Sequence, residues 1–284
     1  MACPQRAAGM SPTQAIRSPA PAHFTPEALK FLRGLTRHND RAWFDPRKPI
    51  FERELRAPML ALIEQLNHAL AAVAPEHIRP PHKTMMRIYR DTRFDASRNQ
   101  PARPYKTQIA AWFARTGMEK TSGAGFYFHL SATELLIAAG CYMPAPGQLL
   151  AIRRHIVQHH AELRALLTSK KILAKMSRFD SDRAAPPLTR LPRGFSVSDP
   201  NILAAQDLIL PRQWGVRASL PAEAATRPTL LKEIATRFAL AAPLVAFLNT
   251  PILCDTAKSQ QIEEIMSQKP NKPHETRKKP VETL

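Results

Sequence analysis

The stretch Gly125-Phe126-Tyr127-Phe128-His129-Leu130-Ser131 decides the fold class, together with the apolar run Leu135 to Tyr142 that follows a short polar link. In the first stretch Phe126, Phe128 and Leu130 alternate with more polar side chains, and successive side chains of a strand point to opposite faces. Two such runs joined by a short link predict a β-hairpin at about residues 125–143. One face of this hairpin should pack on a core.

Helical patterns flank the hairpin on both sides. Thr25 suits the N-cap of a first helix and Pro26 its first position, because a threonine hydroxyl can accept a backbone N–H and a first helical residue needs no N–H of its own. Apolar residues at spacings of three and four predict further helices. These start at Asp45-Pro46, after Pro146, near Ile202 and at Thr229, and the last should end near Leu248. Pro58 should bend the second helix.

Three other segments have strand-like composition: Met85–Phe94, Thr107–Phe113 and Gln213–Leu220, the last suited to a sheet edge. Helices followed by a strand-rich middle and then by helices do not alternate as βαβ units do. The predicted fold class is therefore α+β, with a central, mostly antiparallel sheet packed with N-terminal and C-terminal helices.

A single α+β domain is expected over residues 23–254 of the 284-residue chain. Residues 1–22 are predicted to be a disordered tail, and residues 255–284 a largely disordered polar tail. The N-terminus has no signal-peptide pattern, and no uninterrupted apolar run approaches the roughly 18 residues of a membrane span. Three widely spaced cysteines suit neither a disulfide framework nor a zinc site, so we expect a cytoplasmic protein without a membrane partner.

The chain is strongly basic, with 41 basic and 23 acidic side chains and a formal charge of +18. Residues 1–22 carry +2 and residues 255–284 carry +1, which leaves +15 for the folded body. This excess of positive charge predicts an anionic partner, either a small ligand or nucleic acid. Nucleic acid is the less favoured partner, because recognisable nucleic-acid-binding motifs are missing.

The densest cluster of functional groups is the motif Arg87-Ile88-Tyr89-Arg90-Asp91-Thr92-Arg93-Phe94. In a strand, Arg87, Tyr89, Asp91 and Arg93 share one face, and Arg90 points to the other. Guanidinium groups bind carboxylate or phosphate with two hydrogen bonds, so this face could hold a small anionic ligand while Asp91 orients one arginine. The alternative is an internal ion-pair network in a structural or interaction domain.

His129 is a second candidate, because the hairpin places it beside Tyr127 on the face opposite the core. A histidine next to a tyrosine could transfer protons near neutral pH. The alternative is a hydrogen-bonded histidine with a structural role. If the Arg87 strand pairs with this hairpin, both sets of residues would line one cleft.

His155, His159 and Glu162 have helical spacings that superficially suggest a metal site. Burial of His159 on the apolar side of its helix explains this spacing better, and no metal is predicted. The chain has only nine glycines and no glycine-rich phosphate loop, so no cofactor is predicted either.

Several motifs occur in order between about Phe24 and Pro251 and together resemble a known family. These motifs are Phe24-Thr25-Pro26-Glu27, Asn39-Asp40-Arg41-Ala42-Trp43-Phe44, the Arg87–Phe94 motif, Pro104-Tyr105-Lys106-Thr107, Gly125–Leu130, Gly140–Pro144 and Leu191-Pro192-Arg193-Gly194-Phe195. The family is domain of unknown function 2461, a group of uncharacterised bacterial and fungal proteins. The resemblance implies a shared fold, and it implies no known activity.

The resemblance also implies which residues form a site. Arg87, Arg90, Asp91, Arg93 and Lys106 are the expected ligand-binding residues, and Tyr105 joins His129 as a candidate for proton transfer. This chain departs from the family pattern in two places. The link Asp95–Arg103 is longer than is typical, and Gln108 replaces a histidine. The sequence thus favours a domain that binds a small anionic ligand, and it leaves open whether that domain is an enzyme.

Overall fold

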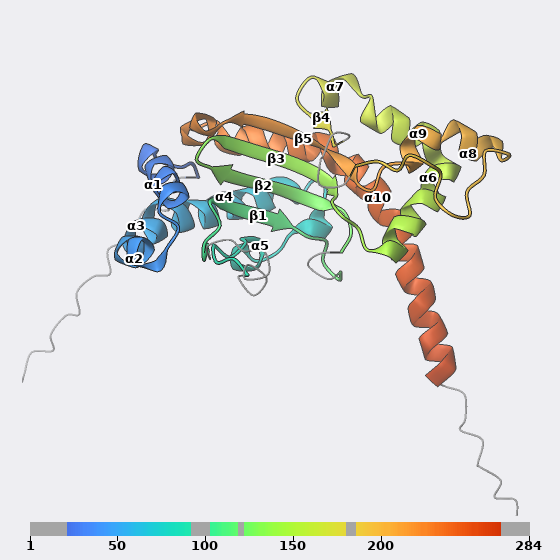
Figure 1. Cartoon of the computed structure of the whole chain (residues 1–284), viewed down its shortest axis with the longest axis horizontal. Coiled ribbons are helices and arrows are strands. Elements are labelled where there is room, and N and C mark those ends of the chain that lie inside the picture. Colours follow the sequence, from blue (N-terminus) through green and yellow to red (C-terminus); the bar gives the residue numbers. More distant parts are fainter. Residues whose placement is uncertain (1–21, 92–102, 119–121, 180–185, 268–284) are drawn as a thin grey trace, which may run out of the picture.

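The computed structural model describes residues 22–91, 103–118, 122–179 and 186–267, and of residues 255–267 it describes only the helical backbone. A five-stranded antiparallel sheet with the order β1-β2-β3-β5-β4 forms the centre (Figure 1). The strands are β1 (Gln108–Phe113), β2 (Gly125–Ser131), β3 (Glu134–Cys141), β4 (Ser177–Arg178) and β5 (Trp214–Pro221). The predicted α+β class and the β-hairpin are confirmed.

The predicted edge position of β5 was wrong. The two-residue strand β4 pairs with the outer side of β5 through Ser177 and Arg178. Strand β3 pairs with its other side along its whole length. So short a strand carries no alternation of apolar and polar residues that the sequence could reveal.

Helices gather on one face and at both ends of the sheet (Figure 1). α4 (Ala57–Leu70) and α10 (Leu230–Ser267) cover one face, which we call the helix side, and the opposite face is the outer face. The remaining helices are α1 (Pro26–Arg37), α2 (Arg41–Phe44), α3 (Lys48–Phe51) and α5 (Pro81–Thr84) near the N-terminus, and α6 (Pro146–Leu167), α7 (Lys170–Leu173), α8 (Pro200–Ala204) and α9 (Gln206–Ile209) at the other end. Short 3-10 turns cover Asp45–Arg47, Pro75–His77 and Ala222–Thr226.

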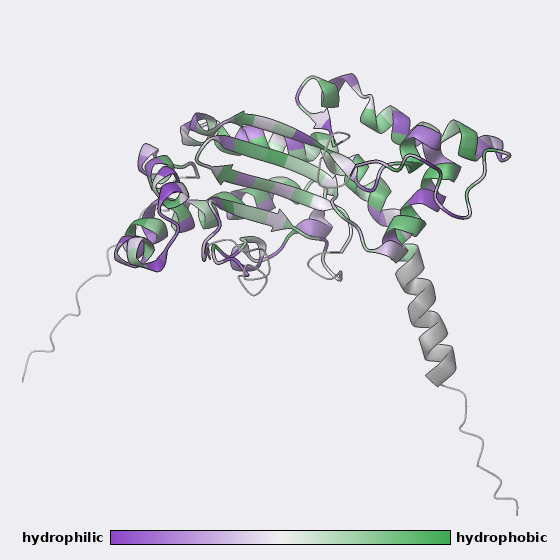
Figure 2. Ribbon diagram, viewed as in Figure 1, coloured by the Kyte–Doolittle hydropathy of each residue, from purple (hydrophilic) through white to green (hydrophobic). Residues whose placement is uncertain are grey.

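The core lies between the sheet and the helix side. Phe126 and Phe128 of β2 and Phe238 of α10 are almost completely buried there, and the rings of Phe126 and Phe238 are 5.0 Å apart. Figure 2 shows largely hydrophobic strands, whereas α1 to α3 alternate between hydrophobic and hydrophilic residues. This pattern matches helices that pack on a core with one side and face water with the other.

The predicted start of the first helix is confirmed. The Thr25 side chain accepts a hydrogen bond from the backbone N–H of Ala28 at 3.2 Å, and Pro26 is the first helical residue. The same Thr25 hydroxyl donates to a carboxylate oxygen of Glu54 at 2.7 Å. This bond lowers the pKa of Glu54 and ties the start of α1 to the turn that precedes α4.

The second predicted helix is divided into several short segments. A π-helical turn, Glu52–Arg56, separates α3 from α4 just before Pro58. Pro58 has no N–H to donate to the carbonyl of Glu54, and its ring would clash with that carbonyl in a regular helix. A wider turn avoids the clash, so the predicted bend takes this form.

Helix α10 is longer than predicted, since it ends at Ser267 rather than near Leu248. Within the described ranges, its span Leu230–Cys254 is the one helical stretch long and apolar enough to cross a membrane. However, 61% of that apolar window is buried inside the fold, and the helix packs against β3, α4 and α6. It is the central core helix of this domain, as expected for a soluble protein.

The Arg87 segment runs antiparallel to residues 104–111 without forming a regular strand. Two isolated bridges join Met85 to Ala111 and Tyr89 to Tyr105. The bridged residues are four positions apart in the Arg87 segment and six positions apart in its partner, so the ladder contains a bulge on the side of residues 105–111. The predicted strand Met85–Phe94 is reduced to these bridges, and its last residues, 92–94, lie outside the described residues.

Candidate functional site

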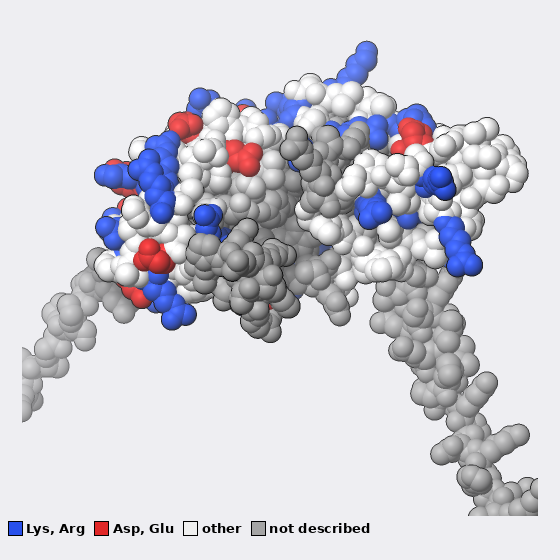
Figure 3. Space-filling view, viewed as in Figure 1, with Lys and Arg blue, Asp and Glu red and all other residues white. Residues whose placement is uncertain are grey.

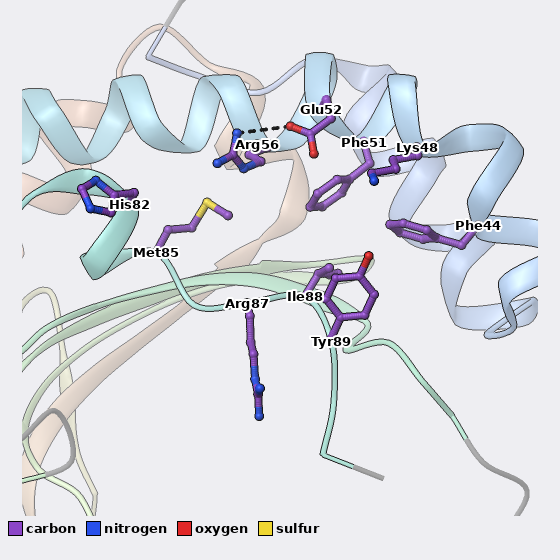
Figure 4. A pocket seen from close by; sticks show the side chains of 10 residues that line it. All are labelled: Phe44, Lys48, Phe51, Glu52, Arg56, His82, Met85, Arg87, Ile88 and Tyr89. Atoms are coloured by element: carbon purple, nitrogen blue, oxygen red, sulfur yellow. Dashed lines mark hydrogen bonds and ion pairs between the residues drawn. The ribbon is translucent and has the colours of Figure 1, made fainter.

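A groove of about 530 Å³ lies between the N-terminal helical turns and the Arg87 segment (Figure 4). The apolar residues that line it are Phe44, Phe51, Met85, Ile88 and Tyr89. Its charged surface comes from the basic residues Lys48, Arg56 and His82 and from one carboxylate, Glu52. The volume is within the range of about 300–1,000 Å³ that is common for small-molecule sites.

The aromatic floor of the groove is part of the core. Phe44 and Phe51 are only 1% and 4% exposed, and their ring centroids are 5.6 Å apart. Phe44 also stacks on Tyr105 with a centroid distance of 4.1 Å. Tyr89 lies 5.4 Å from Tyr105 and is 49% exposed. The floor is therefore part of the packed core, and Tyr89 forms the exposed edge of the groove.

The charged wall comes largely from the π-helical turn. Glu52 and Arg56 lie at its two ends and form an ion pair of 3.3 Å, with both side chains nearly half exposed. Lys48 approaches from α3, and His82 approaches from α5 (Figure 4). An exposed ion pair contributes little to stability, about 0–1 kcal/mol. Arg56 can thus exchange Glu52 for another anion at low cost.

Three of the motifs that carry the family resemblance meet at Tyr105. The Asn39 side-chain amide donates to the Tyr105 carbonyl, and its oxygen accepts the Tyr105 N–H, both at 3.0 Å. Asp40 caps α2 by accepting the N–H of Trp43 at 2.8 Å. These bonds hold Phe44 against Tyr105, and Tyr89 packs beside them. The motifs therefore build the floor of the groove.

The predicted ligand-binding residues are not all brought together. Arg87 contributes to the groove wall, but its side chain points away from the groove, whereas the ring of Tyr89 points toward it (Figure 4). The expectation that Arg87 and Tyr89 share a face was wrong, because the segment bends at Ile88 and does not continue as a regular strand. Arg90 and Lys106 flank the paired tyrosines, and their backbone N–H groups bond to residues 104 and 88. Asp91 ends this described segment and is exposed, and Arg93 lies outside the described residues.

Tyr105 and His129 lie on opposite sides of the sheet. Tyr105 is 2% exposed within the aromatic stack on the helix side, and burial, followed by the charge of Asp45, raises its pKa. His129 lies on β2 among outer-face residues. The Arg87 segment pairs with residues 104–111 rather than with the hairpin, so β1 separates it from β2. The two sets of predicted residues do not share one cleft.

On the outer face, a row of polar side chains links four strands. Gln108 donates to the Tyr127 hydroxyl at 3.2 Å, and that hydroxyl lies 3.0 Å from Nδ1 of His129. Nε2 of His129 lies 3.5 Å from Glu134 Oε1, and Ser219 donates to Glu134 Oε2 at 2.7 Å. We call these five residues the polar row.

Burial shifts the pKa values within the polar row. His129 is 7% exposed, and desolvation lowers the pKa of its imidazole although the Glu134 carboxylate opposes this change. Desolvation also raises the pKa of Tyr127 to about 12, against the hydrogen bond from Gln108. At neutral pH both side chains are therefore uncharged.

The histidine pair of α6 also differs from the prediction. His159 is exposed, and His155 is the partly buried member, with its ring 4.7 Å from that of Phe247. The helix is distorted at His159, where φ is −128° and ψ is 29°. This distortion turns His159 away from the apolar side of the helix, so its expected burial was wrong.

Sequence reasoning did not single out the groove residues Lys48, Glu52, Arg56 and His82. The spacing of four residues from Lys48 to Glu52 to Arg56 was a usable signal, because it places all three on one side of a helix. Their proximity to Tyr89 was not visible, since more than thirty residues separate Arg56 from Tyr89 in the chain.

These features define an α+β protein with one antiparallel sheet, two core helices on one face and an open groove at its N-terminal end. The family model of domain of unknown function 2461, described as a conserved hypothetical protein, matches residues 27–247, and the chain belongs to this family. Membership in this family does not identify an activity for the protein. No curated protein matches the chain.

Proposed function

We propose that this protein binds a small organic anion in the groove. An apolar or aromatic part of the ligand lies against the half-exposed ring of Tyr89, next to the buried rings of Phe44 and Phe51, and its carboxylate or phosphate faces Lys48 and Arg56. The observation that carries this proposal is the combination of a buried aromatic floor with an exposed basic wall in one groove of about 530 Å³. Ligand sites commonly combine such apolar surface with a few polar groups that fix orientation.

The chemistry of the wall favours an organic anion over an inorganic one. Glu52 already pairs with Arg56, so a ligand anion must compete with that carboxylate. Contact with the half-exposed ring of Tyr89 supplies additional free energy, about 25 cal/mol per Å² of apolar surface removed from water. Arginine can also bind a carboxylate or phosphate through two parallel hydrogen bonds.

The cytoplasm is the proposed location. Cys141 and Cys254 are both free thiols within the described part of the chain, which suits a reducing compartment. Nucleic acid remains the alternative partner because of the formal charge of +18. Figure 3, however, has lysines and arginines spread over both ends of the visible face rather than gathered in one patch.

A thermal-shift experiment tests the groove. Phenylphosphate and 3-phenylpropionate should raise the melting temperature, whereas inorganic phosphate and 3-phenylpropanol should do so much less. A ligand at about 100 times its Kd stabilises a folded protein by about 2.7 kcal/mol. Arg56→Gln and Lys48→Gln should each reduce the response.

Arg154→Gln is the matched control, because Arg154 is exposed on α6 at the other end of the sheet. It removes one positive charge without touching the groove. Equal responses of the Arg56 and Arg154 variants, or no shift with either organic anion at millimolar concentration, would contradict the proposal. A gel shift of a random DNA duplex at low salt would instead support nucleic-acid binding.

A further inference from the structure

The groove has one carboxylate between two positive charges. Among the described residues that line the groove, Glu52 is the one acidic residue. It follows Lys48 by four residues and precedes Arg56 by four, and its side chain lies between theirs (Figure 4). Its ion pair with Arg56 is a contact of 3.3 Å between Oε2 and a terminal guanidinium nitrogen. A group that enters the groove therefore meets both signs of charge side by side.

Both members of this ion pair keep most of their hydrogen-bonding capacity. A carboxylate has two acceptor oxygens, and a guanidinium group has five N–H donors. Within the described part of the chain, the 3.3 Å contact is the one hydrogen bond that either side chain makes. By contrast, Arg164 and Asp207, far from the groove, are joined by two hydrogen bonds of 2.9 and 2.8 Å. The Glu52–Arg56 pair is thus open, and a ligand can reach both side chains, which are 44% and 43% exposed.

A ligand with negative charge alone would meet Glu52 unfavourably. In the proposed function, the acidic group of the ligand faces Lys48 and Arg56, and Glu52 lies between these two residues. Like charges at short distance repel, and a groove screens them less than open solvent does. An ammonium group next to the acidic group removes this conflict, because it can bind Glu52 while the acidic group binds Arg56. One ion pair within the protein is then exchanged for two ion pairs with the ligand.

We propose that the ligand of the groove is an α-amino acid with an aromatic or large apolar side chain, an inference that rests on the proposed function. Its carboxylate is the anionic group that binds Arg56 and Lys48, and its ammonium group donates to Glu52. An α-amino acid carries both groups on one carbon, which matches the adjacent charges of Glu52 and Arg56. Its side chain lies against the half-exposed ring of Tyr89. Glu52 is therefore the residue that distinguishes an amino acid from a simple carboxylate.

Calorimetric titration at pH 7 with two ligands tests this assignment. Phenylalanine and 3-phenylpropionate have the same carbon skeleton and the same carboxylate, and they differ in the α-ammonium group. The wild-type protein should bind phenylalanine about 10-fold more tightly, because a hydrogen bond to a charged group typically contributes at least this much. Arg56→Gln should weaken the binding of both ligands, since both carry the carboxylate.

Glu52→Gln should reverse the preference between the two ligands. The amide is uncharged, so phenylalanine should bind about 10-fold more weakly than it binds the wild-type protein. Binding of 3-phenylpropionate should become several-fold tighter, because the repelling charge is gone. Glu64→Gln is the matched control, since Glu64 is exposed on α4 and is not among the residues that line the groove. It should keep the wild-type preference.

The outcomes separate this inference from the proposed function. Equal affinities of the wild-type protein for the two ligands would overturn the amino-acid assignment and leave binding of an organic anion intact. A preference for phenylalanine that persists undiminished in folded Glu52→Gln would also overturn it, because the ammonium group would then be recognised elsewhere. Melting temperatures verify that each variant is folded. No binding of either ligand at millimolar concentration would overturn both proposals.

Discussion

The two faces of the sheet hold their polar groups in opposite ways. In the groove on the helix side, the charged side chains of Glu52 and Arg56 are nearly half exposed and lie next to the buried rings of Phe44 and Phe51. On the outer face, the central member of the polar row, His129, is itself buried and joined to its neighbours. Exposed charges can change partners cheaply, whereas a buried polar group is costly to leave unpaired. The groove therefore suits reversible binding, and the polar row suits a fixed geometry.

The largest expected effect on stability is the difference between a substitution in the buried floor of the groove and one at its exposed edge. Phe44→Ala removes a fully buried ring that stacks on Tyr105, and it should lower the free energy of unfolding by about 3–5 kcal/mol. Tyr89→Ala, at the half-exposed edge, should lower it far less. Urea unfolding of both variants measures the difference. Similar losses for the two variants would mean that the floor is not part of the core.

A second prediction compares the two faces directly. His129→Ala leaves Tyr127 and Glu134 without their central partner and should lower the free energy of unfolding by about 1–3 kcal/mol. Arg56→Ala breaks an exposed ion pair and should lower it by about 0–1 kcal/mol. Chemical denaturation at pH 7.5 gives both values. If Arg56→Ala were the more destabilising, the contrast between the faces would be wrong.

A third prediction concerns pH. Burial lowers the pKa of His129 and of His77, which is fully buried and donates from Nδ1 to the Phe113 carbonyl at 2.9 Å. A histidine whose pKa is lowered by folding binds fewer protons in the folded state than in the unfolded state. Its contribution to stability is therefore complete above its unfolded pKa of about 6.5 and is lost as pH falls toward the folded pKa.

Melting temperatures between pH 8 and pH 5 measure this effect. The wild-type protein should lose stability below about pH 6.5, and His129→Gln should have a shallower slope because it removes one of the titrating groups. Ser219→Ala is the control, since it removes a bond to Glu134 and leaves His129 in place. A steeper slope in His129→Gln than in the wild-type protein would contradict this assignment.

The smallest expected effect on stability concerns the exposed ion pair of the groove. Glu52→Gln removes the negative charge beside Arg56 and should change the free energy of unfolding by no more than about 0.5 kcal/mol. The same change should tighten binding of phenylphosphate several-fold, because the ligand no longer competes with a carboxylate. Calorimetric titration of the wild-type and Glu52→Gln proteins measures this gain. Weaker binding in the variant would show that Glu52 supports the ligand.

Local patterns were sufficient for much of the fold and for part of the site. The alternation in Gly125–Ser131 predicted the hairpin and placed Tyr127 and His129 on the same face, since a strand alternates its side chains whatever surrounds it. The same rule failed at Arg87, because that segment bends at Ile88 and meets its partner only through isolated bridges, which depend on tertiary packing. Glu134 and Ser219 were also missed, since cross-strand contacts depend on register.

The sequence by itself determined the α+β class, the capped start of α1, the hairpin and the side of the sheet that His129 occupies. Each of these follows from residues close together in the chain. Only the tertiary structure decided the groove, because its aromatic and basic residues come from Phe44 to Arg56 and from His82 to Tyr89. Asn39 holds Tyr105, and through it the Tyr89 segment, against Phe44. Such contacts between distant segments depend on packing, which no local pattern specifies.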